Sequence, residues 1–145
     1  MEYKMFNKSK NIAEQYLYLK LKYRPLPKSG IFNNTLIWEQ EIQSDKFSKK
    51  YTIRIEYDMS VPKVYINNQN ILQSKNDIIP HNYYTKYISD KNQIVQLCLF
   101  YPKRKEWQRY MYIADTIVPW TIEWIYYYEM WRITGEWYGG GIHNA

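Results

Sequence analysis

Three short runs of alternating apolar and polar residues in the first half of the chain restrict its fold more than any other feature. They span Ile31 to Ile42, Tyr51 to Tyr57 and Pro62 to Ile66. Turn residues bound them, among them the segment Lys28-Ser29-Gly30. Period-two alternation between turns is typical of antiparallel strands with one buried face. We therefore expect an antiparallel meander of three or four strands.

The segment from about Ser9 to Tyr23 fits two patterns. Leucines at every second position, 17 to 21, alternate as in a strand, whereas a helical stripe joins Ile12, Tyr16, Leu19 and Tyr23. The length of the segment and the candidate N-caps Asn7 and Ser9 favour a helix. We expect this helix to end at Arg24-Pro25, because proline disfavours helical geometry in the residue before it.

Aromatic residues dominate the last third of the chain. One stripe at helical spacing contains Trp120, Trp124, Tyr127, Tyr128 and Trp131. Thr116 or Asp115 is a suitable N-cap, and Gly135 suits a left-handed stop. We predict a helix whose aromatic face packs on the sheet, with hydrogen-bond partners for the indole and phenol groups.

A second hairpin is predicted between these regions. The turn Ser89-Asp90-Lys91-Asn92 would fold the segment His81-Asn82-Tyr83-Tyr84 back beside Leu97-Cys98-Leu99. Alternation would then place Gln96 and Cys98 on one face of the sheet, and the apolar residues around them on the other. On this interpretation the thiol lies on the more polar face.

Cys98 is the only cysteine of the chain, so it has no partner for an internal disulfide or a cysteine-based metal site. Two interpretations remain open. As a nucleophile, the thiolate would hold an acyl group as a thioester, assisted by nearby cations such as Lys103 or Arg104 and by Asn82 or backbone amides as oxyanion donors. As a structural residue, Cys98 between two leucines would be a small buried hydrophobe.

Composition argues against several other classes. The net charge of +6 is dispersed, without the long basic stripe that phosphate tracking requires, so we expect no dedicated nucleic-acid partner. The two histidines, His81 and His143, form no zinc motif, and Gly139-Gly140-Gly141 lacks the spacing of a phosphate-binding loop. We expect no cofactor and no metal.

The same composition sets expectations for organisation and location. With 145 residues the chain fits one domain over residues 1–145. No apolar run approaches the roughly 20 residues that cross a bilayer, and the N-terminal segment lacks the pattern of a secretory signal. Together with the single unpaired cysteine, these features indicate a cytoplasmic protein without a membrane partner.

Several motifs, taken in order, carry a resemblance to a known family. They are Pro80-His81-Asn82-Tyr83, Leu97-Cys98-Leu99-Phe100-Tyr101-Pro102, Glu106-Trp107, Ala114-Asp115-Thr116-Ile117-Val118-Pro119-Trp120, Glu123-Trp124, Tyr128-Glu129, Trp131, Thr134-Gly135, Trp137 and Gly139-Gly140-Gly141-Ile142-His143. Together they resemble the ubiquitin-conjugating-enzyme-like proteins of cyclic-oligonucleotide-based antiphage signalling systems (CBASS). The match covers about the last 65 residues strongly, and the preceding sheet more faintly.

The resemblance implies an α+β, ubiquitin-conjugating-enzyme-like fold with an N-terminal helix, a four-stranded antiparallel meander and C-terminal helices. It implies that Cys98 is the thioester carrier, with His81 and Asn82 in the active-site segment. His81 would either hold this segment by hydrogen bonding or transfer a proton. The histidine, proline and asparagine stand in a different order from the His-Pro-Asn of eukaryotic relatives.

The implied partner is a cGAS/DncV-like nucleotidyltransferase, whose C-terminal tail would be joined to an amine to prime antiphage signalling. A chain of this length matches the stand-alone form, which leaves a place for a separate activating enzyme. An alternative from another class is a non-catalytic conjugating-fold module that binds and regulates the nucleotidyltransferase. A basic RNA-binding domain is a third possibility, which salt-dependent binding would reveal.

Overall fold

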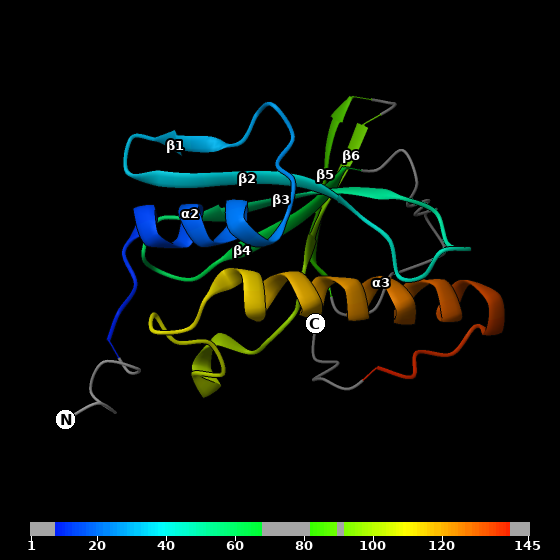
Figure 1. The fold of residues 1–145 in the computed structure, drawn as a ribbon. Coiled ribbons are helices and arrows are strands. Elements are labelled where there is room, and N and C mark those ends of the chain that lie inside the picture. The colour runs from blue at the N-terminus through cyan, green and yellow to red at the C-terminus, as the bar shows by residue number, and fades with distance from the viewer. Residues whose placement is uncertain (1–7, 68–81, 90–91, 140–145) are drawn as a thin grey trace.

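Six antiparallel strands, ordered β1-β2-β3-β4-β6-β5, form one sheet in the computed structural model, which describes residues 8–67, 82–89 and 92–139 (Figure 1). Residues of two α-helices, α2 and α3, pack together with the buried face of this sheet in one hydrophobic core. The architecture is thus α+β, as predicted. The strands are β1 (Gly30–Phe32), β2 (Thr35–Ile42), β3 (Tyr51–Tyr57), β4 (Lys63–Asn67), β5 (Asn82–Ser89) and β6 (Asn92–Leu97), and the helices are α2 (Ile12–Lys22), α3 (Ile117–Thr134) and the short 3-10 helices η1 (Pro102–Arg104) and η2 (Ile113–Asp115).

The sheet is larger than the predicted four-stranded meander. Strands β1 to β4 form that meander, and the hairpin of β5 and β6 extends it because β6 pairs with β4. The run from Ile31 to Ile42, predicted as one strand, is itself a hairpin. Asn33 and Asn34 both have positive φ, 50° and 60°, and asparagine tolerates this left-handed conformation in tight hairpin turns.

The predicted alternation of the strands determines which side of the sheet is buried. In β2 and β3 every second residue is buried, and the register sets Trp38 opposite Ile55 and Gln40 opposite Ile53. The one polar residue among these, Gln40, accepts a hydrogen bond from the indole nitrogen of Trp38 at 2.7 Å. Pairing the indole with the buried amide avoids the free-energy cost of leaving it unsatisfied.

Helix α2 confirms the helical interpretation of the N-terminal segment, but its N-cap is Asn11. The Asn11 side chain accepts a hydrogen bond from the backbone N–H of Glu14 at 2.8 Å, and the Glu14 carboxylate accepts one from the Asn11 N–H at 3.2 Å. This reciprocal capping box satisfies two backbone donors at the helix start. The prediction of Ser9 as the cap is therefore wrong, and Asn7 lies outside the described residues.

Helix α3 begins after Thr116 and ends at Gly135, whose φ of 80° confirms the predicted left-handed stop. Thr116 occupies the N-cap position but makes no capping bond with its side chain. Its hydroxyl instead accepts a hydrogen bond from the indole N–H of Trp107 at 3.0 Å and donates one to the carbonyl of Tyr112 at 2.8 Å. These bonds fix the segment that leads into the helix.

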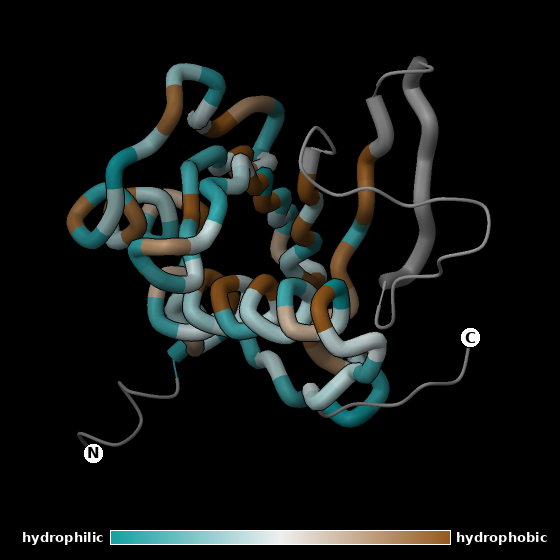
Figure 2. The backbone as a smooth tube through the Cα atoms, turned by 90° about the vertical axis from the view of Figure 1, so that its right-hand side faces the viewer, coloured by the Kyte–Doolittle hydropathy of each residue, from teal (hydrophilic) through white to brown (hydrophobic). Residues whose placement is uncertain are grey.

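Helix α3 and the sheet form two layers in the view along the helix (Figure 2). Four residues of the aromatic stripe of α3 belong to the core or pack against it, and these are Trp120, Trp124, Tyr128 and Trp131. Trp124 and Tyr128 are buried and stacked, with ring centroids 5.5 Å apart. Tyr51 of β3 donates its phenol to the Glu129 carboxylate at 3.3 Å. The expectation that every ring polar group is paired is wrong for Trp124, because its buried indole N–H has no hydrogen-bond partner among the described residues.

Candidate active site

Cys98 directly follows Leu97, the last residue of β6, so it lies where this strand ends. The residue is partly exposed, and its thiol lies 4.0 Å from the carbonyl oxygen of Phe100. A partly exposed Cys98 does not fit the interpretation as a small buried hydrophobe. The predicted alternation holds as far as Leu97, which is buried like Val95, whereas Gln96 is only partly buried.

The sheet opens beside this cysteine. Strands β4 and β6 pair from Asn67 opposite Ile94 to Tyr65 opposite Gln96, and the ladder stops there. If it continued, Val64 would lie opposite Leu97, and Lys63 opposite Cys98. Each of the two strands keeps its other neighbour at this point, because Val64 still pairs with β3 and Leu97 still pairs with β5. The opening is therefore a local separation of two strands that remain anchored on their far sides.

Two features of the sequence explain the separation. Pro62 has no backbone N–H, so it cannot donate to a ladder and suits only the start of a strand. On the other side, Phe100 packs against Trp120 of α3, with ring centroids 6.1 Å apart. This contact directs the chain after β6 toward the helix.

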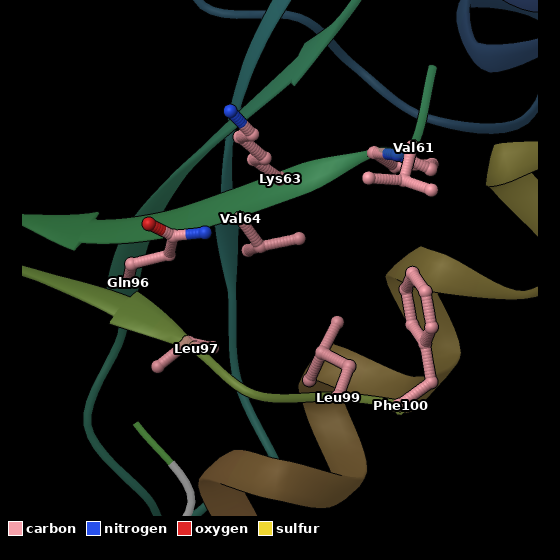
Figure 3. Close-up of a pocket in the computed structure, with 8 residues that line it drawn as sticks. Val61, Lys63, Val64, Gln96, Leu97, Leu99 and Phe100 are labelled. Carbon is pink, nitrogen blue, oxygen red and sulfur yellow. The ribbon is translucent and has the colours of Figure 1, made fainter. Parts of the chain in front are cut away.

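A pocket of about 340 Å³ occupies the opening. Its walls are mostly apolar, and they come from the two separated segments: Val61, Pro62, Lys63, Val64, Gln96, Leu97, Leu99 and Phe100. Figure 3 shows the Leu99 and Phe100 side chains directed toward Val61 and Val64, with the Lys63 ammonium pointing away from them. Cys98 thus lies in the chain between residues that line the pocket.

The predicted hairpin brings Asn82 close to this point. Asn82 begins β5, and its backbone pairs with Leu97, the residue before Cys98. The prediction that this segment folds back beside the cysteine is confirmed for Asn82. His81 and His143 lie outside the described residues.

The predicted cations and Trp107 have clear places. Lys103 and Arg104 lie exposed on η1, and the Arg104 guanidinium sits 5.8 Å from the ring centroid of exposed Tyr101. Trp107 is 5% exposed and contacts the Tyr57 ring edge-on at 5.3 Å. Its burial and its bond to Thr116 give Trp107 a structural role.

Sequence reasoning named most of the pocket residues as strand or motif positions, but it did not predict a pocket among them. The branched side chains of Val61 and Leu99 resemble any other core residue in the sequence, and Lys63 resembles any surface lysine. The one local signal was Pro62 at the start of a strand, which marks a position where ladder pairing is interrupted.

The partly exposed residue Cys98 thus lies where an antiparallel sheet opens, beside an apolar pocket. Comparison with family models gives a match to the type II CBASS E2 proteins over residues 15–144. The chain therefore belongs to the type II CBASS E2 protein family and has a conjugating-type role in this antiphage system. Comparison with curated proteins finds no match.

In the described part of the chain, no helix is a candidate for spanning a membrane. Neither α2 nor α3 combines the length and the apolar character that a bilayer span requires.

Proposed function

We propose that the protein is a thioester-forming transferase that carries the C-terminus of a partner cGAS-like nucleotidyltransferase on Cys98 and passes it to an amine. The observation that supports this most is the position of Cys98, partly exposed where β4 and β6 separate. Membership of a CBASS E2 family supports the choice of partner, because such a protein acts together with other members of the system.

The chemistry needs an activated donor, for which we propose an acyl adenylate made by a separate activating enzyme. The Cys98 thiolate attacks the acyl carbonyl, a C–S bond forms, the C–O bond to AMP breaks, and AMP leaves with the electron pair. An acceptor amine then attacks the thioester carbonyl, a C–N bond forms, and the C–S bond breaks. The amine loses a proton and the thiol is regenerated, so no redox step is involved.

Both steps pass through a tetrahedral intermediate with a negatively charged oxygen. Asn82 is our candidate donor to this oxygen, since its backbone pairs with Leu97 next to Cys98. Backbone amides near Cys98 are the second candidate. For His81, which precedes Asn82, we propose the positioning role, in which it orients the active-site segment by hydrogen bonding.

The direct test combines the protein with its matched nucleotidyltransferase, the activating enzyme and ATP. Intact-mass analysis should detect an adduct that thiol reductant releases. The Cys98→Ser variant should give a reductant-stable ester, because an oxygen ester resists thiol exchange. Absence of any adduct with the matched partner would contradict the transferase.

The Cys98→Ala variant separates the transferase from a non-catalytic module that binds the same partner. A transferase should lose the adduct and antiphage protection while its affinity for the nucleotidyltransferase stays within about twofold. Full protection by Cys98→Ala would instead establish the binding module. Because Cys98 is partly exposed and contributes little to the core, we expect this variant to fold.

A further inference from the structure

The pocket between β4 and β6 has a shape and a lining that suit one kind of occupant. Its volume of about 340 Å³ has room for a bulky side chain, and its walls are mostly apolar. Val64 and Leu97 would form the next rung of the ladder, but no β4–β6 pair is made there. An extended peptide between the separated segments has its own N–H and C=O groups to offer to strand edges, as in recognition by strand addition.

The direction of the side chains defines the arrangement further. Residues on one face of a strand alternate with those on the other, and a continued register would put Lys63 and Cys98 opposite each other on one face. The buried residues Val64 and Leu97 lie on the other face. A tail entering here presents alternate side chains to the two faces, so one side chain can enter the pocket while its neighbours along the tail lie on the face of Cys98.

Lys63 adds a charge to the rim of this site. The residue is exposed, and no carboxylate in the described residues lies within salt-bridge distance of its ammonium. In the acyl adenylate the terminal carboxyl is bonded to AMP, so the group that would complement Lys63 on this face is the negatively charged adenylate phosphate.

We propose that this pocket is the specificity subsite for the acyl donor: it takes one bulky aliphatic side chain from the last few residues of an extended C-terminal tail, with the tail's end held at the Lys63 side. The inference rests on the proposed function, since the tail it describes is that of the donor. It goes further because it defines which tails the protein accepts.

The first test measures tail binding without acyl transfer. Fluorescein-labelled octapeptides of glycine and alanine, each with one leucine at one of the last four positions, are titrated against the Cys98→Ala variant by fluorescence anisotropy. Burial of the leucine should make one position bind about tenfold tighter than the all-small peptide. Affinities equal within twofold across the whole series would overturn the proposal.

Two pocket variants locate the binding site. Val61→Phe fills the pocket and should weaken the preferred leucine peptide about tenfold, with no effect on the all-small peptide. Leu99→Ala enlarges the pocket and should shift the preference from leucine to phenylalanine at the same peptide position. The matched control is Leu17→Ala, since Leu17 is 64% exposed on α2. Equal effects of Leu99→Ala and Leu17→Ala would contradict the assignment.

Lys63→Ala tests the charge at the rim, with exposed Lys28→Ala as its control. Removing Lys63 should severalfold weaken peptides that end in a non-hydrolysable, negatively charged acyl sulfamate analogue of the adenylate, and should leave C-terminally amidated peptides unchanged. Equal losses for both peptide ends would contradict this role.

Failure of the proposed function has a different signature. If peptides bind with the expected preference but no Cys98 adduct forms in the full system, the transferase proposal is contradicted and the tail-binding site still stands. If the Val61→Phe variant forms the adduct with an unchanged KM for the tail, the tail-binding site is contradicted and the transferase proposal still stands.

Discussion

Two pairs of neighbouring strands in the sheet differ in how completely they are joined. Strands β2 and β3 are joined over seven consecutive residue pairs, from Leu36 opposite Tyr57 to Ile42 opposite Tyr51. Strands β4 and β6 share only three pairs before they separate beside Cys98. The first region, β1 to β3 with α2, we call the closed region; the second, residues 61–64 and 96–100, we call the open end.

This difference indicates that the closed region stabilises the fold and that the open end carries the reactive residue. The core residues of the closed region are fully buried, with Trp38, Ile53 and Ile55 all at 0% exposure. The open end keeps its reactive residue and most pocket residues partly exposed. A rigid scaffold can hold one functional segment without covering it, because the entropy cost of ordering that segment is offset by burial elsewhere. Substitutions should accordingly affect stability in the closed region and tail chemistry at the open end.

The largest loss of stability should come from Trp38→Ala. Trp38 is fully buried, contacts the Tyr16 ring edge-on at 6.0 Å and donates to Gln40, so truncation leaves both a cavity and an unpaired amide. We expect urea denaturation to show a loss of about 4 kcal/mol. The control Leu17→Ala should change stability by less than about 0.5 kcal/mol. Equal losses in the two variants would contradict the assignment of the core.

Gln15→Ala should have the next largest effect. The buried Gln15 amide donates to the Met111 carbonyl at 2.8 Å and accepts from the Ile113 N–H at 2.9 Å, so it joins α2 to the segment before α3. Losing both bonds should cost about 3 kcal/mol in thermal or chemical unfolding. Gln43→Ala, which removes a single bond to the Ser48 carbonyl, should cost about 1 kcal/mol. The reverse order would show that Gln15 is not a structural link.

The third prediction concerns alkaline pH and Tyr51. Burial, and next the charge of Glu129, raise the pKa of Tyr51 above its usual value of 10. The folded state therefore favours the neutral phenol, so this stabilisation is complete below pH 10 and is lost as the pH rises above it. Tyr51→Phe should cost about 1.5 kcal/mol at pH 7 through the lost bond to Glu129 and make the stability fall less steeply above pH 10.

Stability measured from pH 7 to 11 checks this prediction. The exposed Tyr138→Phe serves as the control and should reproduce the steeper profile of the unmodified protein. If the Tyr51→Phe profile were equally steep, another group would be responsible for the alkaline loss.

The smallest effect should come from the helix cap. Asn11→Ala removes the capping box of α2 and should lower stability by about 1 kcal/mol. Ser9→Ala, at the position that the sequence also favoured, should change it by less than about 0.5 kcal/mol. Neither variant touches the open end, so adduct formation per folded molecule should remain unchanged. A slower Cys98 reaction in Asn11→Ala would show that the two regions are coupled.

Local patterns predicted much of this structure. Alternation gave the faces of β3, and the turn at Ser89 gave the pairing of Asn82 with Leu97. Gly135 marked the end of α3 because the residue there needs positive φ. Each of these depends on residues close in sequence, where side-chain chemistry and backbone geometry are directly linked.

The remaining features depend on distant contacts or on close alternatives. The prediction named Asn7 and Ser9 as caps and passed over Asn11, although of these three residues only Asn11 has a glutamate three residues later. The opening beside Cys98 depends on Phe100 packing against Trp120, a tertiary contact between residues twenty positions apart. Pattern analysis identified Cys98 but not the pocket, because a pocket is a property of segments that separate in space.

The most direct test of the account asks whether the fold presents Cys98 as an acyl acceptor. An octapeptide carrying a C-terminal thiophenyl ester needs no activating enzyme, since thiophenolate leaves when the Cys98 thiolate attacks the carbonyl. Intact-mass spectrometry follows the transfer to the folded protein and to the same protein unfolded in guanidinium chloride. We predict transfer at least about tenfold faster to the folded protein, as binding orients the ester; slower transfer to the folded than to the unfolded protein would contradict the account.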